Sequence, residues 1–149
     1  MMIRRVLGAA ALLLLAAAAP PGWGDLASWV GRYPTDSEAH PPARLLETPP
    51  LRAGLQQVLT APDRAKLQAL TNETPVEQSG TFIIVKQCMP HDCGNQNAMV
   101  VLDTISRRMW VGFFARTAHV NSTRWFGTSD VHDLTPDVLR IFDAQHTPQ

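Results

Sequence analysis

Residues 81–103 read TFIIVKQCMPHDCGNQNAMVVLD, and this stretch decides the fold. Its two ends, residues 82–85 and 98–103, are runs of β-branched and large apolar side chains, which is typical of strands. The middle, Cys88-Met89-Pro90-His91-Asp92-Cys93, contains a proline that fixes φ and removes a backbone donor. Gly94 and Asn95 then favour a turn back into the second run. We therefore predict two antiparallel strands joined by an enlarged hairpin loop.

The chain before this stretch is predicted to be helical. Leu51, Leu55 and Leu59 recur at helical spacing. Ala61-Pro62-Asp63 predicts the start of a second helix, because proline is tolerated and an acid is favoured in a first turn. The pattern predicts two short helices separated by a tight corner.

The chain after this stretch predicts further strands and one last helix. Residues 109–115 read MWVGFFA and predict a strand that is apolar on both faces, reached through a turn at residues 104–107. Residues 124–126 predict an edge strand, and Thr135-Pro136-Asp137 predicts the start of a helix. The fold class is therefore α+β: an antiparallel sheet of about five strands with helices packed on it, and a closed loop between two strands.

The N-terminus has the pattern of a secretory signal peptide. A basic start with Arg4 and Arg5 precedes an almost unbroken Ala and Leu run over residues 6–19, which Pro20-Pro21-Gly22 ends. The apolar run is shorter than the roughly 20 residues that span a bilayer. We expect residues 1–24 to be cleaved, a periplasmic product without a membrane anchor, an extended proline-rich lead-in over 25–50 and one domain over 51–149. Trp29, Val30 and Tyr33 are expected to anchor the lead-in.

The charge of the chain excludes one class of partner. Removal of residues 1–24 takes away two arginines and no acid, which leaves 11 basic against 13 acidic residues. Because no basic stripe or run exists, the electrostatic footprint of a nucleic-acid-binding protein is missing.

Cys88 and Cys93 are the two cysteines of the chain. In an oxidising compartment such a pair is normally a disulfide. A metal site with His91, or with His119 and His132 approaching in the fold, is an alternative, but no second cluster completes a tetrahedral ligand set. A redox-active pair usually has the Cys-x-x-Cys spacing, which differs from the spacing here. We expect no metal and no cofactor.

A disulfide that closes so small a ring is an inefficient staple of the whole fold. The chain-entropy model gives it about 2 kcal/mol. It does hold the loop in one shape, which lowers the ordering cost of binding by about 0.5–1.5 kcal/mol for each side chain that would otherwise be immobilised. A rigid recognition loop is favoured over a plain stapled turn.

The segment Gln87-Cys88-Met89-Pro90-His91-Asp92-Cys93-Gly94-Asn95-Gln96, with the Trp-x-Gly-Phe-Phe strand that follows, resembles the Ivy family of inhibitors of vertebrate (C-type) lysozyme. The resemblance is specific over about residues 76–115. It implies that the loop plugs the substrate cleft of lysozyme and that His91 bonds to the catalytic carboxylates. Cys88 and Cys93 are then the clamp, and Pro90 and Asp92 are the neighbours that set shape and hydrogen bonding. Met89 departs from the family, in which many members carry a basic residue.

Other classes of function fit less well. An enzyme that used His91, Asp92 and a cysteine nucleophile would need a free thiol. Because the two cysteines are expected to form a disulfide, we do not expect the protein to be an enzyme. A periplasmic interaction protein that regulates the cell's own murein-cleaving enzymes, the lytic transglycosylases, remains the alternative. The resemblance also leaves a homodimer open, in which Phe113 and Phe114 form either core or a dimer face.

Overall fold

The computed structural model describes residues 22–39 and 41–144. Residues 1–21 of the expected signal peptide therefore lie outside the described residues. No helix in the described ranges is long and apolar enough to cross a membrane.

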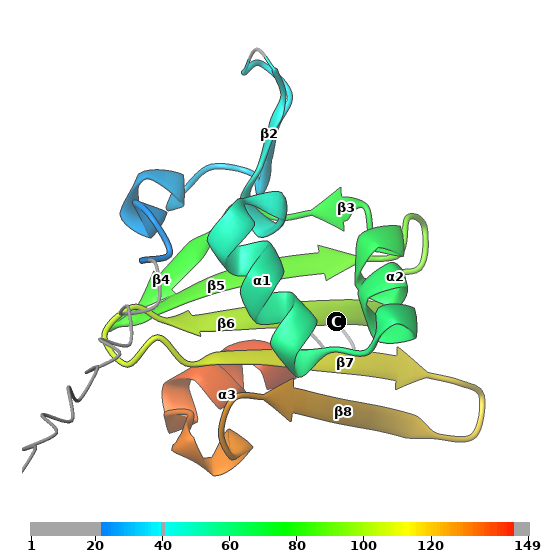
Figure 1. Cartoon of the computed structure of the whole chain (residues 1–149). Coiled ribbons are helices and arrows are strands. Elements are labelled where there is room, and N and C mark those ends of the chain that lie inside the picture. Colours follow the sequence, from blue (N-terminus) through cyan, green and yellow to red (C-terminus); the bar gives the residue numbers. More distant parts are fainter. Residues whose placement is uncertain (1–21, 40, 145–149) are drawn as a thin grey trace, which may run out of the picture.

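The fold is a six-stranded antiparallel sheet with helices on both faces (Figure 1). The strands are β3 (Asn72–Glu73), β4 (Glu77–Ser79), β5 (Phe82–Cys88), β6 (Gln96–Asp103), β7 (Met109–Arg116) and β8 (Asn121–Gly127). Their order is β3-β5-β6-β7-β8, and β4 pairs with β5 beside β3. The α+β class is thus confirmed, and β8 is the predicted edge strand. The sheet has six strands where about five were expected, because two short strands, β3 and β4, both pair with the same edge of β5.

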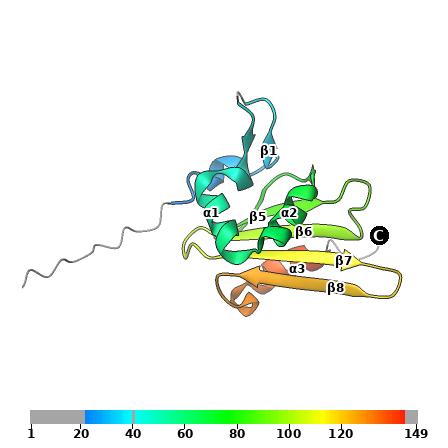
Figure 2. The same cartoon turned by 45° about the vertical axis from the view of Figure 1, so that its right-hand side comes forward.

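Two helices cover one face of the sheet and one covers the other (Figures 1 and 2). The helices are α1 (Pro49–Val58), α2 (Ala61–Ala69) and α3 (Pro136–Ala144). Thr60 caps α2 by accepting a hydrogen bond from the amide of Asp63 at 3.3 Å. The predicted pair of helices and the final helix are therefore confirmed.

The core has two parts because the central strands are apolar on both faces. Leu51, Leu55 and Leu67 pack against one face with Val85 and Val100 of the strands. The other face of the sheet is covered by α3, and Gly112 allows this approach. A Cβ at Gly112 would lie 2.9 Å from the Trp125 ring and 3.0 Å from Phe142.

Phe113 and Phe114 belong to the core. They are 3% and 4% exposed and point to opposite faces, one into each cluster. The dimer face that the sequence left open for this pair is therefore wrong.

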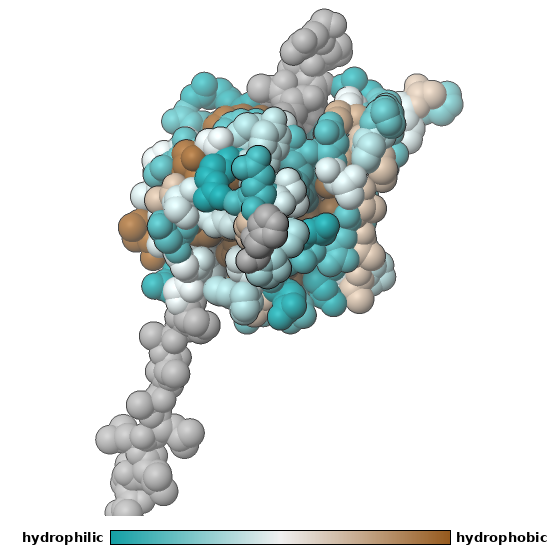
Figure 3. Space-filling view, turned by 90° about the horizontal axis from the view of Figure 1, so that it is seen from above, coloured by the Kyte–Doolittle hydropathy of each residue, from teal (hydrophilic) through white to brown (hydrophobic). Residues whose placement is uncertain are grey.

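The segment before α1 contains more regular structure than an extended lead-in. It forms the 3-10 helices η1 (Leu26–Trp29) and η2 (Leu45–Glu47) and a hairpin of β1 (Thr35–Asp36) and β2 (Ala43–Arg44). Trp29 packs against the core as expected, but Val30 is 38% and Tyr33 is 56% exposed. Tyr33 therefore does not anchor the segment by burial, whereas Val30 pairs with Val76 in a parallel β-bridge, and Leu26 and Leu45 are buried in the core. The face on this side of the molecule is mostly hydrophilic, with small separate apolar patches (Figure 3).

Candidate functional site

The loop between β5 and β6 lies at one end of the sheet (Figures 1 and 2). Cys88 is the last residue of β5, and a disulfide joins it to Cys93 with their Cα atoms 4.8 Å apart. The predicted disulfide is present in the structure. The loop is thus closed at its base, where the two strands separate.

Backbone hydrogen bonds give the closed ring a fixed path. The amide of Met89 donates to the Gln96 carbonyl at 2.9 Å, and the amide of Asp92 donates to the Met89 carbonyl at 3.0 Å. The carbonyl of Asp92 accepts from the amides of Asn95 at 3.0 Å and Gln96 at 2.9 Å. Since both sides of the loop are bonded to each other, the disulfide is only one part of its rigidity.

The carboxylate of Asp92 is turned into the loop. Its Oδ1 accepts from Nδ2 of Asn95 at 2.6 Å, and its Oδ2 accepts from Nε2 of Gln96 at 2.9 Å. Both oxygens therefore brace the return path of the chain. Asp92 therefore helps to hold the shape of the loop.

Two asparagines that the sequence did not single out fasten the loop to the sheet. Asn97 is 3% exposed and donates from Nδ2 to the Cys93 carbonyl at 3.0 Å. Nδ2 of Asn72, on β3, lies 3.0 Å from Sγ of Cys93 and 3.4 Å from Sγ of Cys88. The polar run Asn95-Gln96-Asn97, which follows Cys93 and Gly94, is the sequence signal for the first of these contacts. Asn72 comes from a distant strand and had no such signal.

His91 lies at the tip of the loop and is exposed. Its φ is +63°, in the left-handed region that histidine tolerates better than most residues. Gly94 and Asn95 lie in the turn, as expected, but neither has a positive φ, and His91 takes the left-handed conformation instead. In the described part of the chain the imidazole has no hydrogen-bond partner, so its nitrogens are available to another molecule.

Met89 points away from the tip. Its side chain is half-buried and packs against the core cluster beneath α1 and α2. The position at which this chain departs from the family therefore lies at the base of the loop, beside Cys88.

The β7–β8 turn lies at the same end of the sheet as the loop (Figures 1 and 2). The amide of Arg116 donates to the Asn95 carbonyl at 2.8 Å, which ties the two segments together. Oγ1 of Thr117 accepts from the amides of His119 at 3.4 Å and Val120 at 3.1 Å, and this holds the turn. Val120 is 59% exposed at its tip.

Two observations bear on the catalytic and metal interpretations of the loop. Both sulfurs are in the disulfide, so neither is a thiolate nucleophile or ligand. In residues 22–39 and 41–144, no group of three or more His, Cys, Asp or Glu side chains is placed to hold a metal ion. Neither His119 nor His132 joins His91 in such a group.

Asp103, the last residue of β6, has a buried carboxyl at the opposite end of the sheet, beside the β6–β7 turn. Burial raises its pKa, but hydrogen bonds from the Ser106 hydroxyl and the amides of Ile105 and Ser106 outweigh this and hold the pKa below its usual value. Nη2 of Arg108 lies 3.6 Å from Oδ2 of this carboxyl. The perturbed group is therefore part of a turn and distant from the loop.

Comparison with known proteins gives one result. The family model described as Inhibitor of vertebrate lysozyme (Ivy) matches residues 50–138, from α1 into α3, which is more than half of the chain. No curated protein matches the chain. No solved structure matches it either.

Proposed function

The chain belongs to the Ivy family, the inhibitors of vertebrate lysozyme, and from this premise we propose that it blocks the substrate cleft of C-type lysozyme with the loop Cys88–Cys93. The observation that carries the proposal is the state of His91. An exposed imidazole without an internal partner stands at the tip of a loop that a disulfide and several hydrogen bonds hold in one shape.

The chemistry of the target suits this tip. Lysozyme works with a carboxylic acid of raised pKa beside an ionised carboxylate. An imidazole between the two groups can hydrogen-bond to both, and in a cleft without water a protonated imidazole forms charge-assisted hydrogen bonds. The inhibitor then acts by occlusion and needs no turnover of its own.

The rigidity of the loop favours tight binding. The internal bonds of Asp92, Asn95 and Gln96 hold the loop before it meets the enzyme. Less side-chain and backbone freedom is therefore lost on association, so more of the contact energy appears as affinity.

A second contact is part of the proposal. Val120 is exposed on the β7–β8 turn at the same end of the sheet as His91. Burial of such a side chain against the rim of the cleft adds apolar contact beside the polar tip, as in interfaces where a central anchor is surrounded by contacts that exclude water.

The place of action follows from the N-terminus. The basic start and the apolar run of residues 1–19 support export, and we propose that the protein works in the periplasm. There it meets host lysozyme that has entered from outside. The oxidising conditions also keep Cys88 and Cys93 joined.

The test is an inhibition assay on cell walls with a competitor for the cleft. Lysis by C-type lysozyme is measured against increasing amounts of the purified protein, with and without chitotriose, which occupies the same cleft. The proposal expects inhibition that chitotriose weakens by competition. Inhibition that does not change with chitotriose would contradict occlusion, and an absence of inhibition would contradict the function.

A lytic transglycosylase and a g-type lysozyme are tested in parallel. Inhibition of the transglycosylase with no effect on C-type lysozyme would favour the alternative, in which the protein regulates the cell's own murein-cleaving enzymes. These parallel assays are needed because the half-buried Met89 stands where many family members have a basic residue.

A further inference from the structure

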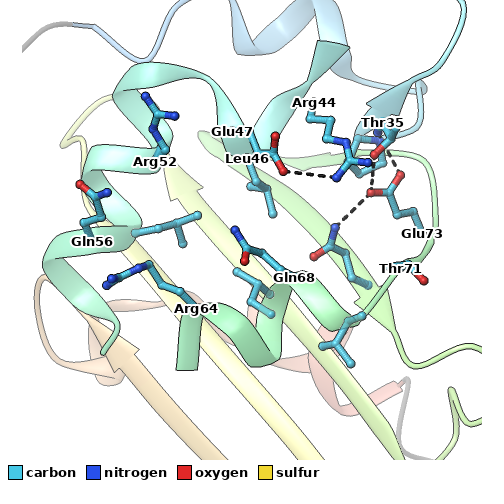
Figure 4. A pocket seen from close by; sticks show the side chains of 15 residues that line it. Thr35, Arg44, Leu46, Glu47, Arg52, Gln56, Arg64, Gln68, Thr71 and Glu73 are labelled. Atoms are coloured by element: carbon cyan, nitrogen blue, oxygen red, sulfur yellow. Dashed lines mark hydrogen bonds and ion pairs between the residues drawn. The ribbon is translucent and has the colours of Figure 1, made fainter. Parts of the chain in front are cut away.

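A pocket of about 310 Å³ lies between α1, α2 and the β1–β2 hairpin (Figure 4), and none of residues 88–93 of the loop lines it. Pro34, Thr35, Arg44, Leu46 and Glu47 form one side of it and precede the range that matches the family. The helices form the other side. Its volume is at the lower end of the range for small-molecule sites, about 300–1,000 Å³.

The two helices present the same three side chains to this pocket. α1 contains Arg52-Ala53-Gly54-Leu55-Gln56, and α2 contains Arg64-Ala65-Lys66-Leu67-Gln68. In each helix the Arg, Leu and Gln are spaced i, i+3 and i+4, so they share one face. All six of these side chains line the pocket.

The carboxylates of the pocket wall are already occupied. Glu47 Oε1 pairs with Nη1 of Arg44 at 3.3 Å. Glu73 accepts from the amide and the hydroxyl of Thr35, each at 2.9 Å, and from Nε2 of Gln87 at 3.1 Å (Figure 4). Neither glutamate neutralises the arginines of the helices.

These arginines keep their charge unpaired. Arg64 donates from Nη1 to the Leu59 carbonyl at 2.7 Å, which is a neutral partner. The guanidinium of Arg52 has no hydrogen bond or ion pair with the described residues, and the backbone amide of Arg52 donates to the Thr48 carbonyl. With three arginines against two glutamates, the pocket has one positive charge in excess.

We propose that this pocket binds a small monocarboxylate with an apolar body. The carboxylate takes hydrogen bonds from the guanidinium groups of Arg52 and Arg64, whose planar donors suit it. The apolar part lies against Leu55 and Leu67, which are 6% and 4% exposed. A monoanion balances the single excess charge, whereas a doubly charged phosphate would leave the wall, with its two glutamates, negative overall.

Two sources supply this chemistry: a free apolar acid and the C-terminal residue of a short peptide. Octanoate and N-acetyl-alanyl-leucine are the probes, and octanamide and N-acetyl-alanyl-leucine amide are their neutral counterparts. The protein purified after export is labelled with ¹⁵N and on its leucine methyl groups, and each probe is titrated to millimolar concentration.

We expect at least one acid to shift the methyl signals of Leu55 and Leu67 and the side-chain amides of Gln56 and Gln68, with its neutral amide at least about tenfold weaker. Binding of octanoate alone identifies a free acid as the source, and binding of the peptide alone identifies a C-terminus. Equal binding of an acid and its amide, or no binding of either acid, overturns the proposal.

Arg52→Gln tests the assigned charge. The Arg52 side chain is exposed and makes no hydrogen bond or ion pair to described residues, so its replacement by glutamine should leave the fold intact. We expect acid binding to weaken at least about tenfold in Arg52→Gln. Arg140→Gln, an exposed arginine on α3 at the other face of the sheet, is the matched control and should bind as the wild type does. Equal binding by Arg52→Gln and the wild type overturns the assignment.

Discussion

Gln96 is bonded twice to Asp92: its backbone amide donates to the Asp92 carbonyl at 2.9 Å, and its side-chain amide donates to the Asp92 carboxylate at 2.9 Å. Asn95 holds the other carboxylate oxygen at 2.6 Å. One residue therefore sets the course of the chain from the loop tip back into β6. The loop remains shaped even where its side chains are exposed.

Asp92→Ala should loosen the loop without unfolding the protein. It removes one exposed and one part-buried side-chain hydrogen bond, and at about 1 kcal/mol each the free energy of unfolding should fall by about 2 kcal/mol. Amide hydrogen exchange at Asn95 and Gln96 should become faster, and lysozyme inhibition should weaken. Asp92→Asn keeps one acceptor oxygen, so its exchange rates and its inhibition should lie between those of the wild type and those of Asp92→Ala. Unchanged exchange in Asp92→Ala would contradict the role of this carboxylate.

Replacement of both loop cysteines by serine separates shape from stability. The closed ring contributes about 2 kcal/mol on the chain-entropy model, so the double variant should remain folded with a lower melting temperature. The free energy of binding to lysozyme should fall by more than the free energy of unfolding, because the opened loop must be ordered on binding. Chemical denaturation and the lysis assay are measured on the same samples. A loss of stability with full inhibition would show that the disulfide is only a staple.

Much of this fold is readable from the sequence, because long apolar runs with clear periodicity become β5, β6, β7 and the helices. β3 and β4, of two and three residues, are too short to show a period and form only by pairing with β5. The role of Phe113 and Phe114 also needed the structure, since a strand that is apolar on both faces can be covered by a helix or by a second molecule.

Of the contacts that shape the candidate site, only the disulfide could be predicted from the sequence. The spacing of Cys88 and Cys93 and the expected export predicted the disulfide. The left-handed backbone of His91 depends on the path of the whole ring, and the contact from Asn72 depends on a strand 16 residues earlier than Cys88. Such contacts have no local signal, because they are set when distant segments pack.

Val120→Asp tests the second contact of the proposed interface. A charge at this exposed turn should leave stability within about 0.5 kcal/mol of the wild type, as for most surface changes. Inhibition of lysozyme should weaken by about tenfold, since the apolar contact is replaced by a carboxylate that must lose water. Ile105→Asp places the same change at a residue that is 77% exposed at the opposite end of the sheet, and it should inhibit as the wild type does. Equal inhibition by both variants would remove the β7–β8 turn from the interface.

The Asp103 carboxyl should make part of the stability dependent on pH. Its pKa is lowered in the folded protein, so its contribution is fully present above the unfolded value of about 3.9 and is lost as the pH falls through the lower folded value. Asp103→Asn should therefore be less stable than the wild type at pH 7, and the difference should shrink below about pH 4. Urea denaturation from pH 7 to pH 3 measures this. A difference that is constant over this range would contradict the assignment.

The most direct test of the account is the inhibition constant of a His91 variant against C-type lysozyme. His91→Asn is the sharpest change, because asparagine also tolerates the left-handed backbone at φ +63° and so keeps the loop shape without the imidazole. His91→Ala is measured beside it, and His132→Ala, an exposed histidine outside the loop, is the control. The account predicts that both His91 variants inhibit at least about tenfold less than the wild type and the His132 variant, as the loss of a charge-assisted hydrogen bond implies. Equal inhibition by all four proteins would contradict it.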